Sequence, residues 1–326
     1  MLGALGTSLV AALVEDQGTF WLPRQASDMA GRVDASFRLV YWVSVFFFAL
    51  ITFLLVFFVV RFRERKGYEQ QPASEHNTPL EVFWSVIPTL IVIGLFWSGY
   101  RAYMGMTVAP QNTYEVLVTG QKWNWQFTYP NGYVDAQLHV PVDTAIKLTM
   151  SSQDVIHSFF APDFRVKRDV IPGRYTQVWF TPRSTGEHDI FCTEYCGTNH
   201  SSMLSKLVVH RRADFDAWLE DASDFLARMP PAEAGHMLYN VRGCKQCHSV
   251  DGTGGIGPTL AGLYGKREVL VGGQAVEVEE NYLRRSILEP QGEVVAGFDP
   301  VMPTYQGRLK DEEITAIIEY IKTLNP

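Results

Sequence analysis

Residues 192–203 read Cys192-Thr-Glu-Tyr-Cys196-Gly-Thr-Asn-His200-Ser-Ser-Met203 and place two thiols, an imidazole and a thioether within twelve residues. This soft donor set selects copper or zinc over magnesium or calcium, and a weak thioether ligand is typical of copper that carries electrons. The spacing of four fits one helix face, but Gly197 and the polar residues after it predict a loop, in which the donors can converge on one point. A Cys192–Cys196 disulfide is the alternative, and it leaves His200 and Met203 unexplained.

Short β-rich runs separated by glycine and proline turns surround this motif, from about residue 111 to residue 212. Strands of this length and spacing predict an antiparallel sandwich or barrel. His157 follows Ser151-Ser-Gln-Asp-Val-Ile at a strand end and can supply a second imidazole, although alone it would be an ordinary polar loop residue. The expected strands are 114–119, 123–129, 146–151, 175–181, 188–192 and 204–210, and a helix is expected over 213–227.

Two long uncharged runs precede the β-rich region, with 22 residues from Leu39 to Val60 and 19 residues from Val82 to Tyr100. Neither run has a polar stripe, and each is long enough to cross about 30 Å of hydrocarbon as a helix. The positive-inside rule predicts that the connection between them is cytoplasmic and that everything after about residue 105 lies outside the cytoplasm. The basic residues of that connection are Arg61, Arg63, Arg65 and Lys66.

The segments beside these runs each allow two interpretations. Leu9–Val14 resembles the apolar region of a signal peptide, but Met1 is followed by no basic residues, so processing of the N-terminus stays open. Thr78-Pro79-Leu80-Glu81 fits a capping box whose carboxylate lies at the positive end of the helix dipole. The same Glu81 is also a candidate proton-accepting carboxylate at a membrane boundary.

Together these segments resemble the membrane hairpin and copper-A domain of subunit II of heme–copper cytochrome c oxidases. The resemblance covers residues 35–215 and rests on Gly-Gln-Lys-Trp-Asn-Trp at 120–125, on 151–157, on Asp-Val-Ile-Pro-Gly-Arg at 169–174 and on 192–203. It implies a cupredoxin fold that carries two copper ions bridged by both cysteine thiolates of the motif.

The resemblance also implies a role for each side chain of the copper site. His157 and Met203 would complete one copper, and His200 with the backbone carbonyl of Glu194 would complete the other. The side chain of Glu194 would bind magnesium at the contact with subunit I. A hard carboxylate beside soft thiolates agrees with this division.

Two residues outside the ligand motif gain roles from the same resemblance. Glu81, in Leu80-Glu81-Val-Phe-Trp-Ser-Val-Ile-Pro, matches the glutamate at the mouth of a proton-uptake path into subunit I, a role compatible with capping. Trp123 matches the tryptophan through which electrons enter near the copper. An ordinary aromatic packing residue in a strand is the equal alternative for Trp123.

A second redox motif follows Met229-Pro230-Pro231, which is typical of a linker. Gly243-Cys244-Lys-Gln-Cys247-His248 is the attachment signature of c-type heme, in which both thiols bond the heme and the histidine ligates the iron. A thioredoxin-like pair of cysteines is the alternative, but it explains neither His248 nor the missing βαβ pattern.

The residues after this motif resemble a class I cytochrome c, which is an all-α fold. The resemblance implies that the carbonyl of Pro258 accepts the proton of His248. Met302 matches the axial methionine of that family and would be the sixth iron ligand. The other candidates are set aside because Met229 precedes the domain and Met237 lies on the helix leading into the heme motif. A Met/His pair fills both axial positions, so such a heme carries electrons and binds no substrate. The last helix is expected to pack on the first through Ile314, Ile317, Ile318 and Ile321.

The sequence therefore predicts a multi-domain membrane protein. Its expected parts are an N-terminal segment (1–36), a two-helix transmembrane hairpin (37–104), a β-sandwich or barrel cupredoxin domain (105–227) and an all-α class I cytochrome c domain (228–326). The fused cytochrome makes the chain resemble subunit II of a caa3-type oxidase. The expected location is the bacterial plasma membrane, crossed more than once, with both large domains outside.

The expected function is electron relay. One covalent heme c would accept electrons from a cytochrome c-type or other donor, and binuclear copper A would pass them to subunit I, where dioxygen is reduced and protons are pumped. The expected partners are subunit I, other membrane subunits, the donor and the lipid bilayer. A formal net charge of −7 argues against a nucleic acid. The alternatives are the copper-A subunit of a nitric oxide reductase and a membrane-tethered copper chaperone, and a chaperone needs neither Met203 nor covalent heme.

Overall fold

The computed structural model describes residues 18–64, 66–67 and 76–324, so the signal-like run Leu9–Val14 lies outside the described residues. The described chain forms two compact units. The first extends to Gln111 and includes the short segments Asp163–Arg165 and Trp179–Thr181. The second contains the remaining residues of the β-rich region and all of the region after it.

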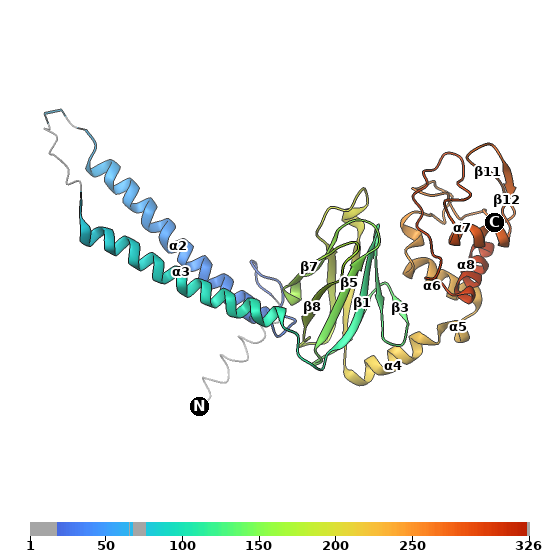
Figure 1. Cartoon of the computed structure of the whole chain (residues 1–326), viewed down its shortest axis with the longest axis horizontal. Helices are drawn as coiled ribbons and strands as arrows, with labels where there is room; N and C mark the ends of the chain where they lie inside the picture. Colours follow the sequence, from blue (N-terminus) through green and yellow to red (C-terminus); the bar gives the residue numbers. More distant parts are fainter. Residues whose placement is uncertain (1–17, 65, 68–75, 325–326) are drawn as a thin grey trace. The chain divides into compact units, whose positions relative to one another are not determined.

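Two helices, α2 (Ala30–Arg61) and α3 (Thr78–Thr107), form a hairpin (Figure 1). Their most apolar 18-residue windows have mean hydropathies of 3.0 and 1.9, and none of these side chains is buried inside the chain. Exposing apolar surface to water costs about 25 cal/mol per Å², so helices of this kind and length are stable in a bilayer rather than in water. Two long apolar helices are thus present where the sequence predicts the membrane hairpin, and each extends beyond its uncharged run.

The N-terminus of α3 is capped, but one residue earlier than the sequence predicts. The N-cap is Asn77, whose side-chain oxygen accepts a hydrogen bond from the Leu80 N–H at 3.2 Å. Glu81 Oε1 accepts from the Asn77 N–H at 3.1 Å. The capping box at Thr78 was wrong in register because Thr78 is already helical, while the reciprocal role of Glu81 in capping is present.

A buried ion pair ties the start of α2 to the turn after residue 164. Asp34 is 1% exposed, and its two carboxylate oxygens accept from Arg165 Nε at 2.8 Å and Nη2 at 2.9 Å. Gln25 donates a further hydrogen bond to Asp34 at 2.8 Å. Removing one partner of such a pair leaves a buried charge uncompensated, so the contact fixes both segments together.

The β-rich region folds as two five-stranded sheets with strand orders β3-β2-β1-β5-β8 and β4-β10-β9-β6-β7. Side chains alternate between buried and partly exposed along β5, which is the pattern of a strand with one face on a core. The strands are β1 (Tyr114–Gln121), β2 (Asn124–Thr128), β3 (Val134–Asp135), β4 (Leu138–Pro141), β5 (Ile146–Ser152), β6 (His157–Ala161), β7 (Val166–Val170), β8 (Thr176–Phe180), β9 (Gly186–Cys192) and β10 (Leu204–His210).

The predicted sandwich is confirmed, with two differences. Strands β3, β4, β6 and β7 were not expected from the sequence. The pairs β1–β5 and β4–β10 run parallel, so the sheets are mixed rather than purely antiparallel. Both parallel pairs join strands that are not consecutive in the chain, which local turn signals do not predict.

Helix α4 (Arg212–Ser223) covers a pair of histidines on the sandwich. His139 Nδ1 lies 2.8 Å from His210 Nε2, and the Trp218 ring stacks on His139 with a centroid separation of 4.0 Å. Burial, together with the neighbouring imidazole, lowers the pKa of His139 to about 3. Burial also lowers the pKa of His210. Both rings are therefore neutral at pH 7.

This pair should make the domain sensitive to acid. In the unfolded chain a histidine titrates near pH 6.5, and His139 in the folded chain does so near pH 3, so the unfolded state binds more protons between these values. The free energy of unfolding should therefore fall as the pH drops below 6.5, by up to about 1.4 kcal/mol per pH unit for one proton. Denaturant unfolding of His139→Gln should show a flatter pH dependence between pH 7 and pH 5. His236→Gln, at an exposed imidazole, is the control and should keep the slope.

The region after Ser223 contains four α-helices around one apolar core. Helix α6 packs on α8 so closely that a Cβ at Gly235 would lie 1.9 Å from the carbonyl oxygen of Ala316. Ile314, Ile317 and Ile321 of α8 are buried, so the predicted packing of the last helix on the first is confirmed. The elements are α5 (Phe225–Arg228), α6 (Pro231–Val241), η3 (Cys244–Gln246), β11 (Arg267–Val269), β12 (Ala275–Glu277), α7 (Glu280–Leu288) and α8 (Asp311–Thr323).

Candidate copper and heme sites

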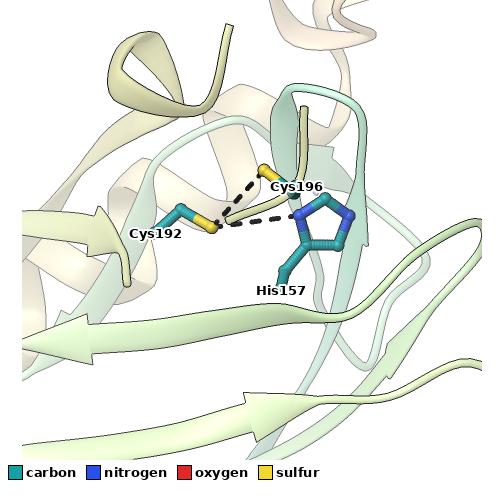
Figure 2. Close-up of side chains that lie close together, drawn as sticks. All are labelled: His157, Cys192 and Cys196. Atoms are coloured by element: carbon teal, nitrogen blue, oxygen red, sulfur yellow. Dashed lines mark hydrogen bonds between the residues drawn. The ribbon is translucent and has the colours of Figure 1, made fainter. Parts of the chain in front are cut away.

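Cys192, Cys196 and His157 converge where β9 ends and β6 begins (Figure 2). The two strands pair with Phe159 opposite Cys192, and this register brings the first residue of β6 to the end of β9. The Cys192 Sγ lies 3.8 Å from the Cys196 Sγ and 3.9 Å from the His157 Nδ1. All three side chains are buried, and their donor atoms lie within 4.8 Å of one another.

The loop after β9 supplies the remaining donors. The Cys196 Sγ lies 3.5 Å from the His200 Nδ1 and 3.9 Å from the Met203 Sδ. The backbone oxygen of Glu194 lies 3.4 Å from the Cys192 Sγ, while the Glu194 side chain is exposed. The structure thus brings together all six residues that the sequence selected. His157 comes from the start of β6, Cys192 from the end of β9 and the other four from the segment between β9 and β10, so they do not share one helix face. Both thiols are free, so the disulfide alternative is not formed.

Asp154 orients the imidazole of His157, a role that the sequence reasoning missed. Asp154 Oδ1 lies 2.9 Å from the His157 Nε2, which turns the other ring nitrogen toward Cys192. Histidines that bind metals usually donate their second N–H to a carboxylate in this way. A Cβ at Gly120 would lie 3.1 Å from the His157 ring, so this glycine leaves room for it. The signal available in the sequence was an acid three residues before a candidate ligand.

The two thiols have opposite pKa shifts. Burial raises the pKa of Cys192, but hydrogen bonds with His157 and with the backbone at Ser158 outweigh burial and lower it to about 6. At Cys196, burial and the charge of the neighbouring Cys192 raise the pKa to about 12. The protein alone therefore favours one thiolate and one thiol. A soft cation between the sulfurs would stabilise both as thiolates, so the donor set fits a copper centre.

Trp123 lies against this donor loop. A Cβ at Gly197 would come within 3.0 Å of the Trp123 ring, so the indole contacts the residue that follows Cys196. Trp123 is 8% exposed, and its Nε1 has no hydrogen-bond partner among the described residues. The burial fits the packing interpretation, although Trp123 lies in the turn between β1 and β2 and not in a strand as expected. The contact with Gly197 fits the electron-transfer interpretation.

The second candidate site is built around His248. Its Nδ1 lies 2.8 Å from the carbonyl oxygen of Pro258, as the resemblance to class I cytochromes implies. A Cβ at Gly257 would lie 2.7 Å from the His248 ring, so only glycine lets the backbone pass here. Burial lowers the pKa of His248, which keeps the imidazole neutral, as a metal ligand must be.

Met302 lines the same cavity as the heme-attachment residues. Cys244, His248 and Pro258 line this cavity together with Met302. Met229 and Met237 line a different hollow beside Tyr320. Two thiols, an imidazole and a thioether thus surround one largely apolar cavity, and this donor set fits a covalent heme with His and Met ligands.

Comparisons with known proteins match the three regions separately. The transmembrane domain of cytochrome c oxidase subunit II matches residues 16–98, its periplasmic domain matches residues 130–210, and the cytochrome c family matches residues 232–325. The fold and the sites define a membrane protein with an outer-side copper-binding domain and a heme c domain. The membrane and copper-domain matches come from one subunit type.

Whole-chain relatives identify that subunit. Cytochrome c oxidase subunit 2 of Alkalihalophilus pseudofirmus is 30% identical over 298 residues, which are 86% of this chain and 85% of that protein. The subunit 2 of Thermostichus vulcanus is 32% identical over 273 residues, with 65% of this chain and 83% of that protein covered. The chain belongs to the cytochrome c oxidase subunit 2 family, and its fused cytochrome c domain agrees with the caa3 type.

Solved structures also match part of the chain. The periplasmic domain of subunit II of cytochrome oxidase from Bradyrhizobium japonicum has 31% sequence identity and a TM-score of 0.35. The match covers 36% of this chain and 98% of that chain.

Proposed function

We propose that this subunit relays electrons from an external donor to the oxygen-reducing subunit I of a proton-pumping oxidase. Heme c in the second site and binuclear copper A in the first would each supply a one-electron carrier. Both donor sets would fill the coordination positions of these groups, so the chain would transfer electrons without transforming a substrate.

The observation that carries this proposal is the convergence of six donors in one place, four of them on buried residues. Cys192 and Cys196 would bridge the copper ions, His157 and Met203 would complete one ion, and His200 with the Glu194 carbonyl would complete the other. The thiolates and the thioether select copper, and Asp154 would hold the His157 ring in its orientation.

The heme domain would use its own residues to fix a second carrier. Cys244 and Cys247 would attach the heme covalently, and His248 and Met302 would bind the iron. The hydrogen bond from His248 to the Pro258 carbonyl would select the imidazole tautomer.

Three further roles belong to the same proposal. Trp123, in contact with Gly197, would be the residue through which electrons reach copper A. The exposed side chain of Glu194 would bind magnesium at the contact with subunit I. Glu81, at the cytoplasmic end of α3, would mark a proton-uptake path in addition to its capping bond.

The domain boundaries and topology are part of this proposal. The hairpin (37–104) would place residues 105–227 and 228–326 outside the bacterial plasma membrane, because the basic connection between α2 and α3 favours the cytoplasm.

Met203→Leu tests the relay. Changes in residues that merely orient metal ligands cost about 10- to 100-fold in affinity or activity, so loss of a ligand should slow electron transfer from heme to copper at least about tenfold. The electron paramagnetic resonance spectrum of the copper should change, and the heme spectrum should not. Rapid-mixing absorbance measurements on the purified oxidase give the rate.

The control is Met150→Leu, because Met150 is equally buried on β5 of the same sandwich. This variant should keep both the spectrum and the rate. A Met203→Leu protein with an unchanged copper spectrum and an unchanged rate would contradict the proposed ligand.

A further inference from the structure

A hollow lined in part by arginine and serine side chains lies between the two membrane helices, close to the ends that adjoin the copper domain in the sequence. Its volume is about 670 Å³, and both helices contribute to its walls. Small residues leave room for it, because Gly94 and Ala102 on α3 and Ala35 on α2 are among the residues that line it. A Cβ at Gly94 would meet no atom within 4 Å.

Two arginines line this hollow, one from each helix. They are Arg32 on α2 and Arg101 on α3, and in the described part of the chain neither forms an ion pair with a carboxylate. Asp34, which is close to Arg32 in sequence, is bound by Arg165 and Gln25. The Arg101 guanidinium lies over the Trp97 ring at 5.4 Å. The hollow therefore contains two positive charges, which would attract an anion.

Hydroxyl groups add neutral hydrogen-bond donors to the same walls. Ser36 Oγ on α2 lies 3.4 Å from Ser98 Oγ on α3. A guanidinium group can donate two parallel hydrogen bonds to phosphate oxygens, and a serine hydroxyl can donate one more.

The depth of the arginines fits the headgroup layer of a membrane. Arg101 directly follows the uncharged run that ends at Tyr100, and Arg32 lies seven residues before the run that begins at Leu39. At 1.5 Å per residue, Arg32 is about 10 Å beyond the hydrocarbon boundary, within reach of its long side chain. Trp97 is the kind of aromatic residue that marks this boundary.

We propose that this hollow binds the phosphate of an anionic phospholipid in the leaflet next to the copper domain. The guanidiniums of Arg32 and Arg101 hold the phosphate, with Ser36 and Ser98 beside it. The acyl chains lie along the exposed apolar surface of α3, where Ile93 is 56% exposed. The inference requires only that the hairpin spans the membrane and is independent of the redox sites.

The test is retention of phosphatidylglycerol by the purified oxidase complex, measured by native mass spectrometry. One basic residue near a membrane surface is worth about fivefold in anionic-lipid binding. Arg32→Gln and Arg101→Gln should each weaken retention about fivefold, and the double variant about 25-fold. Arg38→Gln removes an equal charge from α2 outside the hollow, so retention should fall less than in either variant of the hollow.

A second pair of variants tests the hollow without changing charge. Gly94→Leu should fill it and displace the lipid while both arginines remain. Gly99→Leu is the matched control, since a Cβ there also meets nothing within 4 Å and Gly99 does not line the hollow. Heme content and thermal unfolding of each complex verify that it is assembled.

Four results would overturn the proposal. The first is equal retention in the double arginine variant, and the second is equal retention of uncharged diacylglycerol. The third is displacement of the lipid by excess inorganic phosphate, which would assign the hollow to a soluble anion. Loss of subunit I from the arginine variants would instead show that the hollow is a protein contact, and this too would refute lipid binding.

Discussion

Replacing Cys196 by serine should leave the purified oxidase subunit without copper A while its heme c remains. The Cys196 Sγ approaches three other donors, namely Cys192 at 3.8 Å, His200 at 3.5 Å and Met203 at 3.9 Å. A serine hydroxyl is a hard donor that stays protonated at neutral pH and cannot bridge two soft ions. The ratio of copper to heme c, which is two under the proposed binuclear site, should fall to near zero, and donor oxidation should slow by more than about 100-fold. Metal analysis with electron paramagnetic resonance measures the first, and steady-state oxygen consumption the second.

Cys247→Ser provides the reciprocal control. It removes one thioether bond from the heme and touches none of the copper donors, so copper should remain and the covalent heme seen on a denaturing gel should decrease. Normal copper content in the Cys196→Ser protein would exclude a bridging role for that thiol. Parallel loss of copper and heme in both variants would indicate general misfolding instead.

Gly235→Ala should destabilise the heme domain by about 3 kcal/mol or more, at the upper end of what overpacking costs. The added Cβ would lie 1.9 Å from the Ala316 carbonyl oxygen and 2.8 Å from the Tyr320 Cβ, and both neighbours belong to the facing helix. Alanine is a better helix former than glycine by about 1 kcal/mol, which offsets only part of this cost. Guanidinium unfolding followed by heme absorbance should show a lower midpoint.

The matched control is Gly254→Ala in the same domain. A Cβ at Gly254 meets nothing within 4 Å, and its φ is not in the left-handed region, so the unfolding midpoint should hardly move. If Gly235→Ala had the same midpoint as the unchanged protein, the close approach of α6 and α8 would not be a constraint on this domain.

The sequence predicts the parts of this molecule that depend on local patterns. The uncharged runs determine the membrane hairpin, because length and polarity alone fix a helix in lipid. The motifs at 192–203 and 244–248 each hold several donors within a few residues. His157 and Cys192 lie 35 residues apart, so the residues alone offered His157 only as a candidate second imidazole, and the resemblance to a family assigned it to the copper site.

The features that were missed depend on contacts between distant segments. The ion pair of Asp34 with Arg165 joins residues 131 positions apart, and no local pattern marks either as buried. The parallel pairing of β4 with β10 likewise depends on topology. The N-cap was displaced to Asn77 because Asn and Thr are both good capping residues, and only the backbone conformation distinguishes them.

The crossing of α6 and α8 has a consequence for how this subunit is assembled from modules. Helices α6 and α8 lie near the two ends of the cytochrome domain and pack closely on each other. The domain therefore has a core of its own and can be fused to another domain in one chain. A module that is covalently joined to its neighbour stays close to it whatever the concentration of other proteins. Under the proposed relay, the oxidase would thus carry its own resident reductant and would not have to wait for a diffusing one.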